Sequence, residues 1–438
     1  MSLRSKSKLI KNNYFFFYDY ILGVLASLLP FIKPATAAIL IFFFLNIFFL
    51  RKIRFNRTTF LQALLISLPF FLHILFILNN DSLYEGLKHT EKYLSLLIFP
   101  VLIIAQQISI SISKVLNVYS FLFTLILFVA LIVHFLNNYE LFQQYFNGKL
   151  VWQMGYKFAS SLNSHAPALN MHVAFLVVTN TYLVLNSLLS KRNYLRITFS
   201  LLLLLLSLII LFVLNTRVAF LNTILGILII TIISLKNKIS SKKLLIYVTA
   251  VFLFLVSITT VFTYKFPYMV KKYTDVTFMH LEKIGRLDDF VNPEAEVYSS
   301  LVTRLSIWKS TLDIAKNHLL IGVGAADSKP VLVKSYTDTG QLFLAKHKFP
   351  VHNQYLDFLL KFGVLGLLVL LGYIFNILWI AKNTKSALAY FFFILFLTSN
   401  LTDDFLLRFD GIVFSAFWIC LFASKHSIIV LNRSLPSL

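Results

Sequence analysis

Charged residues and cysteine are both scarce in this chain of 438 residues. Asp, Glu, Lys and Arg together make up 13% of it, about half of the roughly 25% that soluble domains carry. The single cysteine, Cys420, excludes an intrachain disulfide. No phosphate-binding glycine loop, Gly-x-Ser-x-Gly motif or dinucleotide fingerprint occurs. These absences exclude an ordinary soluble enzyme and a disulfide scaffold, and the energy for any reaction must come from the substrate itself.

Hydrophobic residues make up 58% of the chain, with 46 Phe among them, so a water-soluble fold would expose too much apolar surface. We therefore expect an all-α polytopic membrane protein, because lipid offers no partner for backbone polar groups outside a helix. Runs of about 20 apolar residues are long enough to span a bilayer. The sequence predicts about twelve such helices, at residues 14–32, 35–50, 58–78, 93–112, 115–136, 167–189, 195–214, 218–235, 244–263, 363–381, 386–402 and 409–424.

Basic residues outnumber acidic ones by 40 to 18, which gives a net charge of +22. We interpret this excess as membrane topology and expect no nucleic-acid partner, because basic residues collect in cytoplasmic loops. The N-terminus, the C-terminus and the loops on one side of the expected bundle are basic and contain no acid. That side, with both termini, is therefore predicted to be cytoplasmic. The first apolar run lacks a clear small-residue cleavage site, so we expect a retained helix and no signal peptide.

One large polar insertion divides the chain into three parts. Residues 1–263 hold the first nine expected spans, residues 264–362 form a large periplasmic loop, and residues 363–438 hold the last three spans and a cytoplasmic tail. Within the loop, residues 298–320 predict an amphipathic helix and residues 352–362 a short helix at the membrane surface. The apolar face of the amphipathic helix is expected to consist of Leu301, Leu305, Trp308, Leu312 and Ala315.

Three residues are the main candidates for chemistry. Arg217 lies at the outer mouth between the seventh and eighth spans, and charges at membrane depth are functional candidates by default, although an interface anchor would also explain it. Arg304 shares a helix face with Trp308, a pair that could hold an anion, stack on a sugar or simply pack. His352 begins the surface helix, where an imidazole could take a proton from a hydroxyl, although a lone loop histidine usually has no special role.

Weaker candidates lie in other outer loops. Lys92 is four residues from Lys88 on one helix face and could meet phosphate. His165 precedes the sixth span. The carboxylates of Asp403, Asp404 and Asp410 could bind a cation, but a solvated turn is the favoured interpretation. His347 and His352 lack the cysteine or well-placed acid that would complete a zinc site.

The C-terminal half resembles the O-antigen ligase and polymerase family of bacterial envelope glycosyltransferases. His352-Asn353, followed after nine residues by Gly363-Val-Leu-Gly366, is similar to the ligase-type pattern. Arg304-Leu-Ser-Ile-Trp308 with His318-Leu-Leu-Ile-Gly322, and the turn Thr216-Arg217-Val-Ala219, match two further family motifs in order and spacing. Leu319 and Val218 stand where the family usually has Pro and Gly.

The resemblance implies a ligase in the bacterial inner membrane with its site facing the periplasm. It would transfer a glycan from undecaprenyl diphosphate to a lipid A core or similar acceptor, with inversion. His352 would be the catalytic base, and Arg217 and Arg304 would bind the diphosphate. Asn353, Lys92 and His165 are further expected substrate contacts. No cofactor and no metal are expected, and membrane lipids are expected partners.

Three alternatives remain open at this point. A repeat-unit polymerase would share the fold and the donor, and an oligosaccharyltransferase that modifies protein Ser or Thr belongs to the same group. A twelve-span transporter or flippase would need ionisable residues near the bilayer midplane and broken helices in matched halves. The expected spans are nearly free of charge, with Asp19 as the main exception, which favours chemistry at the outer face.

Overall fold

The computed structural model describes residues 17–49, 55–105, 110–146, 151–190, 193–236, 238–265, 278–298 and 300–434, and no β-strand occurs among them. Helices account for nearly all of the described chain. The expectation of an all-α protein is therefore confirmed for these residues.

Seven described helices are long and apolar enough to cross a membrane. They are α3 (Arg57–Leu75), α6 (Ile112–Asn137), α9 (Ala166–Leu189), α10 (Tyr194–Leu214), α11 (Arg217–Leu235), α12 (Ser241–Lys265) and α18 (Gln354–Thr384). Five shorter apolar helices are Phe17–Leu28, α2 (Ile32–Phe49), α5 (Ser95–Phe99) continued by the π-helix η2 (Pro100–Ile104), α19 (Ala387–Thr402) and α20 (Phe409–Ser434). Each of the twelve expected spans coincides with one of these helices. The structure is that of a polytopic membrane protein, and the count of twelve stays a prediction.

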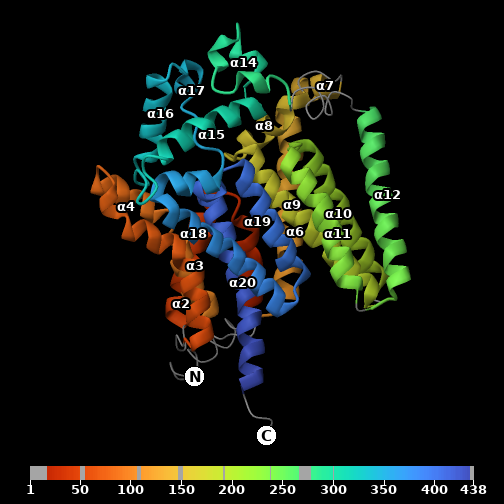
Figure 1. The fold of residues 1–438 in the computed structure, drawn as a ribbon. Helices are drawn as coiled ribbons and strands as arrows, with labels where there is room; N and C mark the ends of the chain where they lie inside the picture. The colour runs from red at the N-terminus through yellow and green to blue at the C-terminus, as the bar shows by residue number, and fades with distance from the viewer. Residues whose placement is uncertain are drawn as a thin grey trace.

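Shorter helices connect and cover these apolar helices. They are η1 (Ile77–Asn79), α4 (Leu83–Glu91), α7 (Tyr139–Phe146), α8 (Val151–Ser161), η3 (Leu281–Lys283), η4 (Leu287–Asp289), α14 (Pro293–Glu296), α15 (Leu301–Ala315), α16 (Ser328–Asp338), α17 (Leu342–His347) and η5 (Phe405–Leu407). In Figure 1, α14 to α17 and α7 gather at the upper end of the bundle. We call η3, η4 and α14 to α17 the cap.

Helix α9 is the centre of the bundle. It contacts α6, α8, α10, α11 and α19, and almost all of its side chains are buried. Phe175 on α9 stacks on Phe391 and meets Trp418 of α20 at a centroid distance of 4.7 Å. Such aromatic contacts add to the burial energy of the rings. Helix α9 therefore joins helices from the N-terminal half of the chain to helices from the C-terminal half.

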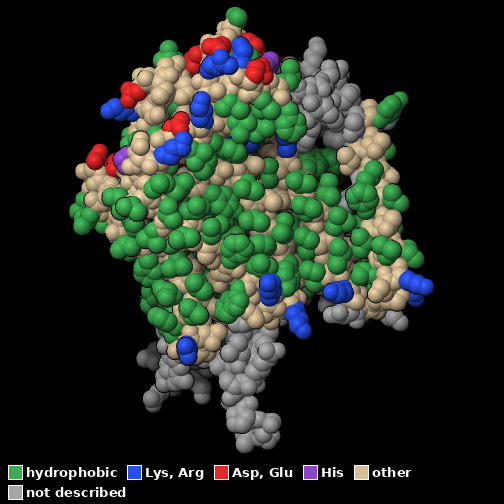
Figure 2. All heavy atoms as spheres, in the orientation of Figure 1, with side chains coloured by type: hydrophobic (Ala, Val, Ile, Leu, Met, Phe, Trp, Pro, Cys, Tyr) green, Lys and Arg blue, Asp and Glu red, His purple; other side chains and the backbone are tan. Residues whose placement is uncertain are grey.

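The cap has a hydrophobic core of its own. Val302 and Ile307 from α15 pack there with Tyr336 from α16, Leu344 from α17 and Leu360 from the first half of α18. Leu360 therefore joins the cap to the helix that enters the bundle. The surface view shows hydrophobic side chains over the middle of the molecule, while the visible acidic side chains gather at the upper end, over the cap and α4 (Figure 2).

The expected apolar face of α15 is wrong. Its buried face consists of Val302, Thr303, Ser306, Ile307, Ser310, Thr311 and Ala315, so of the predicted set only Ala315 is fully buried, and Leu312 is exposed. Hydroxyls can occupy this face because they bond within their own helix, as Thr311 does to the Ile307 carbonyl. The helix is also shorter than expected, because it begins at Leu301, capped by the Ser300 side chain, and ends at Ala315.

Helix α18 is broken at Gly363, where φ is 65° and ψ is −156°. A Cβ at Gly363 would collide with the Leu319 carbonyl, and that carbonyl instead accepts the N–H of Val364 at 2.8 Å. The loop that follows α15 also docks through Val323 N–H to the Leu360 carbonyl and Gly324 N–H to the Lys361 carbonyl. The residues between His352 and Gly363 therefore form one short helix, residues 354–362. This helix ends where the loop 319–324 binds it.

Replacing Gly363 by Ala is expected to destabilise the protein by at least about 2 kcal/mol, because this backbone conformation is essentially restricted to glycine. The added Cβ also collides with backbone that cannot move away cheaply. Thermal unfolding in detergent measures the effect. Gly372→Ala in the same helix is the matched control, because a Cβ there meets nothing within 4 Å. A Gly363→Ala protein that melts with the control would show that the break is dispensable.

Candidate active site

The backbone around His352 is held by contacts from two sides. His352 has a φ of 53°, a conformation that costs a non-glycine residue energy and therefore needs support. The indole N–H of Trp308 donates to the Val351 carbonyl at 3.0 Å. The Asn353 amide donates to the Leu401 carbonyl at 3.2 Å, and its oxygen accepts the N–H groups of the first turn of α18. Trp308 and Asn353 thus fix His352 between α15 and the end of α19.

The imidazole of His352 faces two buried aspartates. Its Nδ1 lies 3.4 Å from Oδ1 of Asp403 and 3.8 Å from Oδ1 of Asp404. The side chains come from the short connection between α19 and η5. Asp403, Asp404 and Asp410 are exposed by only 9%, 0% and 6%, so the favoured expectation of a solvated turn is wrong. A carboxylate behind a histidine fixes its tautomer and stabilises its protonated form.

The two carboxyl groups differ in their pKa because they share one small space. Burial, and then the negative charge of Asp403, raise the pKa of Asp404 to about 7. Burial also acts upward on the pKa of Asp403, but interactions with the side chains of His352 and Asp404 outweigh it and hold that pKa below its ordinary value. At neutral pH, Asp403 is therefore the charged partner of His352, and Asp404 is close to half protonated.

Arg217 is the first residue of α11, at the turn that follows α10. Asn215 makes this turn with a φ of 44°, a conformation that asparagine tolerates better than most residues. The Asn170 amide from α9 donates to the Thr216 hydroxyl at 2.8 Å and fixes the turn to the central helix. A cation at a helix N-terminus opposes the helix dipole, so the dipole of α11 does not stabilise Arg217 in this place.

Tyr156 on α8 connects the two expected arginines with the His352 centre. The charges of Arg304, Asp403 and Arg217 all act on its phenol, and desolvation raises the pKa of Tyr156 above its ordinary value. The phenol therefore stays neutral at physiological pH and can donate a hydrogen bond. Arg304 and Arg217 are both half-buried. The structure thus brings residues from α8, α11, α15 and the α19–η5 connection to one place.

His165 lies at the same centre, directly before α9. Burial and the charge of Arg408 lower its pKa to about 4, and the charges of Asp403 and His352 act on it as well. Its imidazole is therefore neutral at pH 7 and can orient a hydroxyl without competing for its proton. The Nε of Arg408 is buried and has no hydrogen-bond partner among the described residues. Arg408 adds a third guanidinium to those of Arg217 and Arg304.

Lys92 belongs to a different place. It ends α4, and its pKa is lowered by desolvation and by the charges of Lys361 and Lys88. Lys361 binds Asp357 at 2.6 Å in a buried pair at the far end of the short helix from His352, about 10 Å away along the helix axis. The charged groups that act on Lys92 are thus Lys361, Lys88 and Glu85, and its expected contact with substrate stays a prediction.

Four residues of the centre were not among the expected site residues: Asp403, Asp404 and Arg408 from the α19–η5 connection, and Tyr156 from α8. Asp403 and Asp404 were only weak candidates for a cation site. A signal for the first three was present, since residues 403–410 hold four charges in a chain where charge is rare. Tyr156 carried no signal, because one tyrosine among 20 reveals nothing until the fold places α8 beside the Arg217 turn.

The same centre has the donor set of a cation site. One ligand atom each from His352, Asp403 and Asp404 can be chosen so that all lie within 4.8 Å of one another. Carboxylate oxygens with an imidazole are suitable ligands for a divalent cation. Among the described residues, this is the group that could hold a metal, so the expectation of a metal-free site stays a prediction.

The comparisons with known proteins identify a family for part of the chain. A search of curated proteins finds no match. A family model described as O-antigen ligase matches residues 202–371, a range that contains Arg217, Arg304 and His352 but ends before Asp403. The match supports an assignment to the O-antigen ligase family over residues 202–371.

Proposed function

We propose that this protein transfers a glycan from undecaprenyl diphosphate to a hydroxyl of a lipid A core or a similar surface acceptor, at the periplasmic face of the inner membrane. The observation that carries the proposal is the contact between His352 and the buried Asp403–Asp404 pair. The charges of Arg217 and Arg304 reach Tyr156, as does the charge of Asp403. A transfer with a diphosphate leaving group requires a base for the acceptor hydroxyl and positive charge beside the diphosphate.

The reaction follows from the orientation of His352. With the proton of the neutral ring on Nδ1, toward Asp403, Nε2 is free to accept the proton of the acceptor hydroxyl. The hydroxyl oxygen attacks the anomeric carbon of the donor while the bond from that carbon to the diphosphate oxygen breaks. The electron pair leaves with the diphosphate, and the attack from the opposite face inverts the anomeric carbon. No nucleotide is consumed, because the donor is already activated.

The arginines act on the leaving group. Guanidinium groups bind phosphate oxygens in a bidentate manner and stay charged at all relevant pH values. Arg217 and Arg304 would neutralise the charge that develops on the diphosphate, and Arg408 would add to them beside His165. Asp403 meanwhile stabilises the imidazolium of His352, so the positive and negative sides of the transition state each meet an opposite charge.

The charge distribution favours this orientation in the membrane. The visible lower edge of the molecule carries Lys and Arg without acidic side chains, and the acidic side chains lie at the end that holds the cap (Figure 2). The end without acids is the expected cytoplasmic one. The cap and the His352 centre would then face the periplasm, where a lipid-linked glycan is available.

A repeat-unit polymerase is the second candidate, because the family domain and the proposed donor chemistry serve both reactions. The two differ in the acceptor, and the glycan profile of a strain that lacks the protein separates them. Lipid A core without long chains, with full-length polymer retained on the polyprenyl carrier, indicates a ligase. Core capped by a single repeat indicates a polymerase.

His352→Ala is expected to reduce transfer by at least about 100-fold, because general-base catalysis contributes roughly 10²–10⁴ to the rate. Arg217→Ala is expected to abolish transfer as well, while both proteins insert and fold normally. Complementation of the deletion strain, with surface glycan separated by gel electrophoresis, measures the loss. Lys329→Gln, an exposed cap substitution, is the control. Full transfer by folded His352→Ala would remove the proposed base.

The two aspartates should have separable effects on the pH profile. As pH rises through about 7, Asp404 loses its proton and adds a negative charge beside His352, which faces the positive charge that the ring gains in the transition state. Transfer by the wild-type protein should therefore rise across this range. Asp404→Asn should flatten the rise, and Asp403→Asn should reduce the rate at every pH. Identical profiles for wild type and Asp404→Asn would contradict the assignment.

Removal of metal tests whether His352, Asp403 and Asp404 bind a cation instead. If His352 acts as a base, incubation with EDTA should leave the transfer rate of purified protein unchanged. Loss of activity with EDTA, restored by Mg²⁺ or Mn²⁺, would instead make His352, Asp403 and Asp404 ligands of a cation. Asp403→Asn should then weaken the apparent affinity for the added metal.

A further inference from the structure

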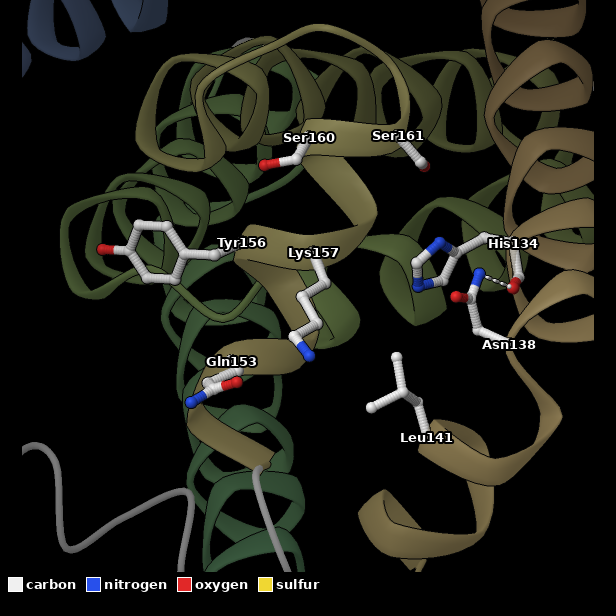
Figure 3. Close-up of a pocket in the computed structure, with 8 residues that line it drawn as sticks. All are labelled: His134, Asn138, Leu141, Gln153, Tyr156, Lys157, Ser160 and Ser161. Atoms are coloured by element: carbon white, nitrogen blue, oxygen red, sulfur yellow. Dashed lines mark hydrogen bonds between the residues drawn. The ribbon is translucent and has the colours of Figure 1, made fainter.

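An open pocket of about 470 Å³ lies beside α8 and is lined by residues from the end of α6, from α7 and from α8. This volume is within the range of small-molecule sites, roughly 300–1,000 Å³. The lining residues are His134, Asn138, Leu141, Gln153, Tyr156, Lys157, Ser160 and Ser161. In Figure 3 the ring of His134 points toward α8, and the Lys157 side chain ends between Gln153 and Leu141.

The cavity adjoins the His352 centre through Tyr156. This side chain lines the cavity, while the charges of Arg304, Asp403 and Arg217 act on its phenol. Gly155, the residue before it, fixes the position of α8, because a Cβ there would collide with the Leu214 carbonyl at the end of α10. Leu214 is three residues before Arg217, so α8 packs directly on the turn that presents this arginine.

The lining has the chemistry of a carbohydrate site. Two amides, two serine hydroxyls and a phenol supply donors and acceptors, and Leu141 and the Tyr156 ring supply apolar contact. His134 is 5% exposed, and neither of its ring nitrogens has a hydrogen-bond partner among the described residues. A buried polar group without a partner costs free energy, and a ligand hydroxyl or carboxylate in the cavity would satisfy it.

The charge of the lining selects an anionic ligand. Lys157 is its one side chain that is always charged, and the lining contains no carboxylate. Its ammonium forms no ion pair within the described chain and lies close enough to His134 for its charge to act on that ring. A neutral sugar would use the hydroxyls and amides but would leave the lysine without a counter-charge.

We propose that this cavity binds an acidic sugar of the glycan that is transferred, with the sugar carboxylate on Lys157 and its hydroxyls on His134, Gln153 and Ser160. This inference rests on the proposed function and names a substrate class for it. The cavity holds the sugar chain on one side of Tyr156, and the arginines hold the diphosphate on the other.

Soluble trigalacturonate is the probe, and the neutral trisaccharide galactotriose is its counterpart. Saturation-transfer difference NMR with the full-length protein in detergent measures the binding of each. We expect trigalacturonate to bind and galactotriose to bind more weakly. Lys157→Gln should weaken trigalacturonate about tenfold, the equivalent of about 1.4 kcal/mol, and should leave galactotriose unchanged. Lys329→Gln makes the same charge change on the exposed surface of the cap and should leave both unchanged.

Three results would overturn the inference: no binding of trigalacturonate, equal binding by Lys157→Gln, or displacement of trigalacturonate by inorganic pyrophosphate, which would make the cavity a diphosphate site. His352→Ala separates this inference from the proposed function, because it should abolish transfer and keep trigalacturonate bound. Normal transfer by His352→Ala with intact binding would defeat the proposed function alone. If His352→Ala loses transfer but the wild-type protein does not bind trigalacturonate, the proposed function stands and the proposed sugar site is wrong.

Discussion

The backbone of α18 leaves the helical conformation at Gly363, and the Leu319 carbonyl accepts the N–H of Val364 across the break. This contact sets the length and direction of the short helix 354–362, and therefore the position of His352 at its start. The same short helix contributes Leu360 to the core of the cap. The cap, the bundle and the proposed base are thus joined through one glycine, whose missing side chain lets two backbones meet.

The stability of the site depends on how its buried charges are shared. An isolated carboxylate in a protein interior costs several kcal/mol, and two adjacent ones repel each other, so one of them keeps its proton. Asp403 is supported by His352 and by the Asp404 N–H, and Asp404 takes the protonated part with a pKa near 7. Apolar residues at positions 403 and 404 would avoid this free-energy cost, so the two carboxyl groups are better explained by a role in the proposed reaction than by stability.

Sequence reasoning predicted the apolar helices and three motif residues, because hydrophobic runs and short spacings are local properties of the chain. Arg217, Arg304 and His352 are 135 residues apart at the extremes, and in the fold the charges of both arginines reach Tyr156, as does that of Asp403, the partner of His352. Asp403 and Asp404 were interpreted as solvated, because a sequence shows that two acids follow a span but not that a histidine covers them. The buried face of α15 was missed because hydroxyls there bond within their own helix, a pattern that hydrophobic periodicity does not register.

The geometry also indicates why α8 is placed between the cavity and the arginines. A lipid-linked glycan has an apolar tail, a diphosphate and a sugar chain, and transfer requires that the bond between the last two lie beside the base. Gly155 fixes α8 on the end of α10, so Tyr156 stands where the proposed diphosphate site and the proposed sugar site meet. Because neither site alone determines where the anomeric carbon lies, only a ligand that fills both would be held with that carbon facing Nε2 of His352. Holding two reacting groups in the right geometry supplies a large part of the rate enhancement of an enzyme.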